Sequence, residues 1–80
     1  MKVEVQLFAT LQPYLPPDAV GDQAFLELPD GSTVAQVQAA LHIPHDFSCL
    51  TVVNGHDASP DQVLTPGDVV AMFPPLAGGL

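Results

Sequence analysis

The chain has 80 residues, of which 48% are hydrophobic, and its formal net charge is -8 at pH 7. This length allows one domain, and this hydrophobic content argues against disorder, which requires low hydrophobicity with high charge. Lys2 is the single lysine or arginine of the chain. Because binding to a phosphate backbone requires clusters of such residues, nucleic acid is excluded as a partner. No apolar run approaches the ~18 residues of a membrane span, and nothing targets the chain for export, so we expect a cytoplasmic protein without a membrane partner.

The first thirty residues contain two predicted strands. Residues 3–8 (VEVQLF) alternate apolar and polar side chains in period two, which is typical of a half-buried strand. Prolines interrupt the next segment, which is predicted as a loop or as one short helical turn with Pro13 early in it. Residues 24–29 (AFLELP) are predicted as a second strand, ended by a Pro-Asp-Gly turn.

A helix is predicted to begin after Thr33. Thr33 and Gln36 have the spacing of a capping box, in which each side chain bonds the other residue's backbone. Val34, Val37 and Leu41 follow at i, i+3 and i+7, which places them on one apolar stripe. We expect this helix to end at Pro44.

The remaining sequence predicts two more strands and a tail. Residues 49–55 (CLTVVNG) lead into an Asn-Gly turn, and their valines indicate burial on both faces. A turn-rich connection, with one helical turn considered for residues 60–63, leads to a last strand at 68–73 (DVVAMF). One helix with four or more strands indicates an α+β domain in which a mixed sheet packs on the helix. This domain spans residues 1–73, and residues 74–80 form a flexible tail.

Few side chains are placed for catalysis or metal binding. Cys49 is the single cysteine, so the chain has no internal disulfide. Because Cys49 lies beside an apolar run, it is interpreted as a buried core residue, with a catalytic thiol as the alternative. One cysteine with scattered histidines does not make a metal site. The histidines, at positions 42, 45 and 56, are interpreted as surface residues, and Ser32 and Ser59 as caps or turn formers.

The tail is the most distinctive segment. Pro74 and Pro75 favour an extended path away from the last strand. Residues 74–79 can reach about 20 Å when extended, which is long enough to enter the active site of a partner. Gly78 and Gly79 let the backbone pass a narrow channel and leave a carbonyl unshielded, whereas the alternative is a frayed chain end.

Several motifs in order resemble the ubiquitin-like sulfur carriers, in particular the small subunit of molybdopterin synthase. They are VEVQLFATL, LELPDGSTVAQVQAAL, VVNG and TPGDVVAMFPPLAGG, and together they cover nearly the whole chain. The resemblance implies the β-grasp (ubiquitin-like) fold, a mixed sheet of four to five strands around one main helix. That fold agrees with the element order derived from the residues.

The resemblance also implies a sulfur carrier without an autonomous active site. An E1-like enzyme would use ATP and magnesium to adenylate Gly79, with Gly78 as spacer, and sulfur transfer would make a thiocarboxylate. The molybdopterin synthase large subunit, or another sulfur acceptor, would receive the tail, and no cofactor would be bound stably by this chain. The residues implied to guide the tail into the partner are Phe73, Pro74, Pro75, Leu76 and Ala77. Phe73 could equally be a core residue at the end of its strand.

Leu80 departs from the family pattern, because adenylation requires a terminal glycine carboxylate. Three interpretations remain: a protease trims the chain to expose Gly79, Leu80 is left over from cloning, or the chain has lost carrier chemistry and is a non-catalytic interaction module. Alternative functions are sulfur transfer to thiamine, a tRNA base or another sulfur metabolite, and attachment through Gly79 as a ubiquitin-like protein modifier.

Overall fold

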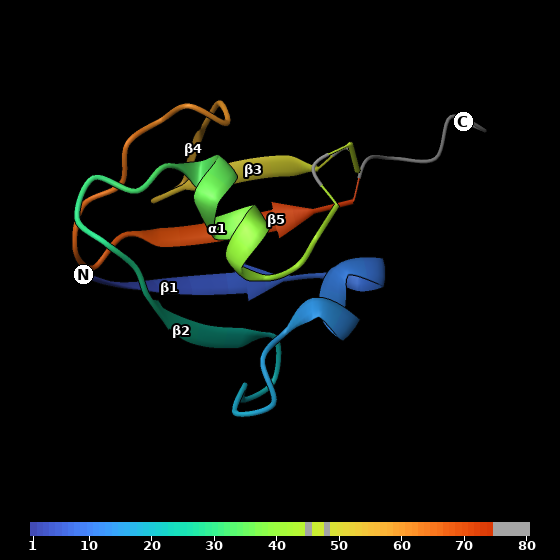
Figure 1. Cartoon of the computed structure of the whole chain (residues 1–80). Helices are drawn as coiled ribbons and strands as arrows, with labels where there is room; N and C mark the ends of the chain where they lie inside the picture. Colours follow the sequence, from blue (N-terminus) through green and yellow to red (C-terminus); the bar gives the residue numbers. More distant parts are fainter. Residues whose placement is uncertain (45, 48, 75–80) are drawn as a thin grey trace.

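The structure is a computed structural model that describes residues 1–44, 46–47 and 49–74 (Figure 1). Its elements, in chain order, are β1 (Lys2–Leu7), the 3-10 helix η1 (Ala9–Tyr14), β2 (Gln23–Glu27), α1 (Val34–Ala40), β3 (Leu50–Val53), β4 (His56–Asp57) and β5 (Val69–Phe73). The strands form one five-stranded sheet in the order β2-β1-β5-β3-β4. The central pair β1 and β5 is parallel and the other pairs are antiparallel, so the predicted α+β fold with a mixed sheet is confirmed.

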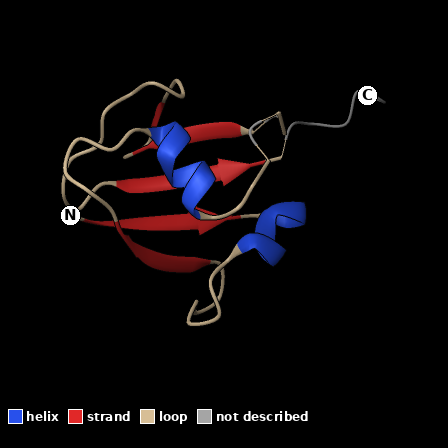
Figure 2. Cartoon of the chain, in the orientation of Figure 1, coloured by secondary structure: helices blue, strands red, loops and turns tan. Residues whose placement is uncertain are grey.

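The core lies between α1 and one face of the sheet (Figure 2). The period-two pattern of β1 buries Val3, Val5 and Leu7, and β5 buries Val70 and Met72 beside them. The apolar stripe that was predicted for the helix covers these side chains with Val34, Val37 and Leu41. Alternate residues of each strand therefore point to the opposite face, which we call the open face. In the described part of the chain, no helix is long and apolar enough to cross a membrane.

Local hydrogen bonds set both ends of α1. At its start the capping box is confirmed: the Gln36 N–H donates to Thr33 Oγ1 (3.4 Å) and the Thr33 N–H donates to Gln36 Oε1 (2.8 Å). The expected stop at Pro44 is wrong, because α1 already ends at Ala40. His42 has a positive φ of 63°, and the bonds from the His42 N–H to the Ala39 carbonyl and from the Ile43 N–H to the Gln38 carbonyl form a Schellman motif.

The connection before β5 is not helical, which corrects the helical turn considered for residues 60–63. Instead, Val63 pairs with Thr33 in an isolated bridge. The carbonyls of Pro60 and Gln62 accept hydrogen bonds from the Ala35 and Val34 N–H groups. Because the first N–H groups of a helix have no partner inside it, this segment completes the start of α1 rather than coiling on itself.

The structure also differs from the sequence predictions at Pro13, in the burial of β3 and at β4. Pro13 lies near the end of η1, not early in it. Residues 50–53 are not buried on both faces, since α1 covers only one face and Leu50 is 56% exposed on the other. The short strand β4 was not predicted, although the Asn-Gly turn before it requires a partner strand.

The turn motifs hold the end of the sheet where β5 begins. Asn54 and Gly55 have φ values of 52° and 86°, as a type I′ hairpin turn requires. The Asn54 side chain donates to Asp68 Oδ1 (2.9 Å) and accepts from the Val69 N–H (2.9 Å), and the Thr65 N–H donates to Asp68 Oδ2 (2.8 Å). The VNG and TPGD motifs therefore tie two turns together at the end of β5 opposite Phe73.

Candidate functional site at the base of the tail

The tail leaves the domain at the carboxyl end of β5. Phe73 is the last residue of the strand, and Pro74, which is half-buried, follows it. The other predicted tail residues, Pro75, Leu76, Ala77, Gly78, Gly79 and Leu80, lie outside the described residues. The structure thus defines the surface from which the tail starts.

An apolar surface surrounds this starting point on the open face. Phe73 stacks on Phe8 with ring centroids 4.7 Å apart and an interplanar angle of 8°. The Phe8 N–H donates to the Met72 carbonyl (3.3 Å), which extends the pairing of β1 with β5 and brings the two rings together. On the other side, Leu50 of β3 is paired with Phe73. We call Phe8, Leu50 and Phe73 the tail-base surface.

Phe73 lies on the open face and not in the core. It is 36% exposed, whereas its neighbour Met72 is completely buried under α1. Exposed aromatic and aliphatic side chains that gather in one place are typical of protein interaction sites. The interpretation of Phe73 as a core residue is therefore wrong, and its contact with a partner stays a prediction.

Away from the tail, the open face carries polar and charged side chains together with apolar ones. Next to the tail-base surface, Val52 and Ala71 form a half-buried cross-strand pair. Further along β1, the Gln6 amide donates to Glu4 (2.8 Å). A partner that covers this face meets an apolar end first and carboxylates beyond it.

Phe8 and Leu50 were not singled out from the sequence. The signal for Phe8 was present, since the alternation of residues 3–8 puts this aromatic ring on the polar face of its strand with Glu4 and Gln6. Leu50 gave no such signal, because a leucine that opens an apolar run is as easily a core residue.

The nucleophile and base candidates do not form a catalytic group in the described residues. Cys49 packs against the core but is only half-buried, so its interpretation as a buried core residue is correct in part. This burial raises the pKa of its thiol. A raised pKa disfavours the thiolate that catalysis needs. His42 closes α1 and His56 lies on the edge strand β4, both exposed, and His45 lies outside the described residues.

Metal ligands do not gather either. Within residues 1–44, 46–47 and 49–74, no group of three or more histidine, cysteine, aspartate or glutamate side chains could hold a metal ion. The serines act as turn formers, as predicted: Ser32 Oγ donates to the Pro29 carbonyl (2.7 Å), and Ser59 Oγ donates to the Asp61 carboxylate. The described site therefore offers contact area at the base of the tail.

A mixed sheet that holds one helix on one face, with a Pro-Pro and Gly-Gly sequence directly after its last strand, defines the class of β-grasp, ubiquitin-like proteins. The model of the ThiS family matches residues 5–79, which is nearly the whole chain. The chain belongs to the ThiS family, that is, to the ubiquitin-like sulfur carriers. The match extends through Gly78 and Gly79 and stops before Leu80.

Similar solved structures support the same fold. A putative molybdopterin converting factor subunit 1 from Pyrococcus furiosus is 29% identical, with a TM-score of 0.72 over 94% of this chain and 98% of that chain. SAMP1 from Haloferax volcanii is 24% identical, with a TM-score of 0.72 over 99% and 100%. A complex of subunits 1 and 2 of molybdopterin-converting factor from Helicobacter pylori gives 22% identity and a TM-score of 0.62 over 99% and 100%. A comparison with curated proteins gave no match.

Proposed function

We propose that this chain is the sulfur carrier of molybdopterin synthesis, and that Gly79 becomes a thiocarboxylate after Leu80 is removed. The observation that carries the proposal is the placement of the FPPLAGG sequence, which begins on an exposed apolar surface at the end of β5. Similarity to the molybdopterin converting factor subunit of Pyrococcus furiosus supports the choice of pathway. The complex from Helicobacter pylori supports a large-subunit partner, since its first subunit has the same fold.

The chemistry requires an activated carbonyl, because a free carboxylate is a poor electrophile. The Gly79 carboxylate would attack the α-phosphorus of ATP, and pyrophosphate would leave. A sulfur nucleophile would then attack the carbonyl carbon of the acyl-adenylate, and AMP would leave. An E1-like partner supplies ATP and magnesium in this scheme, while this chain supplies the carboxylate and the surface that is recognised.

Each feature of the chain has a separate role in this proposal. The tail-base surface (Phe8, Leu50 and Phe73) would bind the activating enzyme and later the large subunit. The stretch from Pro74 to Ala77 would carry the chain into the partner's active site. Gly78 and Gly79 would pass the narrowest part of that site, because a glycine backbone needs the least room.

Reconstitution tests the proposal. The chain ending at Gly79 is incubated with an E1-like enzyme, ATP, magnesium and a sulfur donor, and its intact mass is measured. We expect the mass increase that corresponds to replacement of one carboxylate oxygen by sulfur, and no increase without ATP. The same chain with Leu80 present is the matched control and should remain unmodified. Failure of the trimmed chain with an enzyme that activates another carrier would overturn the proposal.

A protein modifier is the second candidate, because the fold is also that of SAMP1, a small archaeal modifier protein. In that function, the activated Gly79 would form an amide with lysines of other proteins. Affinity-tagged chain, recovered from cells under denaturing conditions, would then be joined to other proteins by an amide bond between Gly79 and a lysine side chain. The absence of such conjugates, together with the sulfur mass increase, would favour the carrier.

A further inference from the structure

The strand β2 forms an open edge of the sheet. Two hydrogen bonds fix its register on β1: the Leu28 N–H donates to the Met1 carbonyl (2.8 Å), and the Leu7 N–H donates to the Asp22 carbonyl (2.9 Å). In an antiparallel pair, hydrogen-bonded and non-hydrogen-bonded positions alternate. The even-numbered residues of β2 therefore bond to β1, and the backbone N–H and C=O groups of Phe25 and Glu27 point outward.

These outward groups are available for pairing. The turn before β2 uses the outward groups of Gln23, since the Val20 N–H donates to the Gln23 carbonyl (2.9 Å) and the Gln23 N–H donates to the Val20 carbonyl (3.2 Å). Beyond this turn, no backbone group in the described part of the chain pairs with Phe25 or Glu27 on the outer side. An open edge of this kind is a template for another strand.

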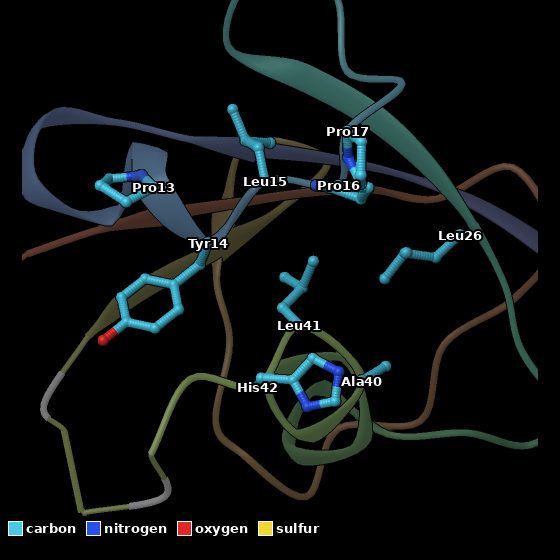
Figure 3. A pocket seen from close by; sticks show the side chains of 9 residues that line it. All are labelled: Pro13, Tyr14, Leu15, Pro16, Pro17, Leu26, Ala40, Leu41 and His42. Carbon is cyan, nitrogen blue, oxygen red and sulfur yellow. The ribbon is translucent and has the colours of Figure 1, made fainter.

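A hollow lies on each side of this edge. On the helix side, Leu26 of β2 faces Leu41 across a hollow of about 450 Å³ that prolines 13, 16 and 17 also line (Figure 3). On the open face, a hollow of about 410 Å³ lies among Val20, Phe25, Asp18 and Glu27. Because the side chains of a strand alternate between faces, a strand added to β2 would project them into both hollows in turn.

The two hollows differ in chemistry. The helix-side hollow is lined mainly by leucines and prolines, which suits aliphatic side chains. The hollow on the open face combines two carboxylates with Val20, which is 78% exposed, and Phe25, which is 52% exposed. A lysine or arginine side chain matches this combination, because its stem is apolar and its head is cationic. Asp22 lies at one end of the edge, and Asp30, at the other end, forms an ion pair with the α-amino group of Met1 (3.4 Å). Lys2 also lines the hollow on the open face, with its Nζ 5.1 Å from the centre of the Phe25 ring, so a basic side chain of the partner would share the hollow with it.

We propose that the β2 edge binds an extended protein segment in which aliphatic and basic residues alternate. The segment adds as an antiparallel strand, with its backbone bonded to Phe25 and Glu27. Its aliphatic residues enter the hollow beside Leu26, and its basic residues lie against Asp18 and Glu27. The proposal is independent of sulfur chemistry at Gly79.

This surface is separate from the base of the tail. Phe73 lies on β5 and Leu50 on β3, whereas β2 is on the far side of β1 from both. A segment bound at the β2 edge therefore leaves Phe73 and Leu50 uncovered, so one protein can hold the domain while another engages its tail.

A blocked hexapeptide of alternating lysine and valine tests the proposal by NMR titration of the full chain. We expect the largest amide shifts at Phe25 and Glu27, with slowed hydrogen exchange at these two amides. A peptide with glutamate in place of lysine should have an affinity at least about tenfold lower, as expected when several exposed ion pairs become repulsive. Equal binding of the two peptides, or protection of the other edge strand β4 instead, would overturn the proposal.

Methylated peptides separate strand addition from simple charge attraction. In the antiparallel arrangement, residues opposite Phe25 and Glu27 place their side chains on the open face, so the lysine amides bond to β2. N-methylation of the lysine residues should abolish binding, and N-methylation of the valine residues should affect it far less. Equal losses would exclude the pairing proposed here.

A pair of protein variants provides the complementary control. Glu27→Lys replaces a carboxylate of the proposed site by an ammonium group and should weaken binding about fivefold. Asp57→Lys makes the same change of charge on the exposed edge strand β4 and should leave the affinity nearly unchanged. If both variants weaken binding equally, the affinity depends only on the net charge of the protein, and the proposal fails.

Discussion

At the scale of single residues, the neighbours Met72 and Phe73 face opposite sides of the sheet, and substitution should destabilise the domain to different extents. Phe73→Ala removes a stacked ring on the open face, so the free energy of unfolding should fall by only about 1 kcal/mol. Met72→Ala leaves a cavity at a completely buried position and should cost about 3 kcal/mol. Chemical denaturation measures both values.

The two variants should reverse their order in a partner assay. With the E1-like enzyme, Phe73→Ala should raise the KM for adenylation about tenfold, because a central aromatic side chain carries much of the binding free energy at an interface. Met72→Ala, measured where it is still folded, should leave the KM nearly unchanged. A KM unaffected by Phe73→Ala would remove the tail-base surface from the partner interface.

Asp68 should make the stability of the domain depend on pH. Its hydrogen bond from the Thr65 backbone lowers the pKa of the carboxyl below 3.8, side-chain bonds from Asn54 and Thr65 act in the same direction, and partial burial opposes them. Because the pKa is lower in the folded state than in the unfolded chain, this stabilisation is present above pH 3.8 and is lost as the pH falls through the folded-state value.

Asp68→Asn should therefore lower the free energy of unfolding by up to about 1 kcal/mol at pH 7, since solvent screens much of the interaction. The difference from the unsubstituted chain should shrink below about pH 4, as measured by denaturation at several pH values. A constant deficit for Asp68→Asn across this range would contradict the assignment.

At the scale of elements, the two ends of α1 differ in how well the sequence predicts them. The start was predictable, because Thr33 and Gln36 are the residue types that a capping box requires. The end was not, because His42 adopts the left-handed conformation that glycine or asparagine usually takes there.

His42→Gly should consequently stabilise the domain. A positive φ is strained for histidine and unstrained for glycine, whereas glycine also gives the unfolded chain more conformational freedom. The first effect should be the larger, so the free energy of unfolding should rise by about 0.5–1 kcal/mol. Ala39→Gly, inside the same helix, should instead lose about 1 kcal/mol. Thermal or chemical denaturation compares them, and a loss for both variants would mean that the left-handed position carries no strain.

The strands also differ in how well the sequence predicts them. Residues 3–8 and 68–73 could be placed because strong alternation or a long apolar run marks them. β4 could not, because two exposed polar residues have no periodicity and are a strand only through their pairing with Val52 and Val53. The connection at 60–63 was misjudged for the same reason, since its carbonyls serve the first turn of α1, a contact made across the fold.

At the scale of the whole molecule, the core can be followed through the described residues alone. The buried apolar residues run from Val3 to Met72, and α1 and the sheet enclose them. The boundary between domain and tail at residue 73 stays a prediction, and the sequence did not predict which side chains surround the end of β5. Phe8, Leu50 and Phe73 meet only because β1, β3 and β5 are adjacent in the sheet.

Gly79→Ala, in the chain that ends at residue 79, should therefore separate function from folding. The melting temperature should match that of the unsubstituted trimmed chain, since the core residues that the structure describes end at Met72. Sulfur transfer should fall severely, because a methyl group is added next to the reacting carbonyl. A large loss of thermal stability would contradict the separation of tail and domain.

The most direct test of carrier function is the intact mass of the untagged protein purified from its native cell. Sulfur carriage predicts a fraction of the protein that ends at Gly79 and carries sulfur in place of one carboxylate oxygen. A population that consists entirely of the chain with Leu80 and an unmodified carboxylate would contradict it.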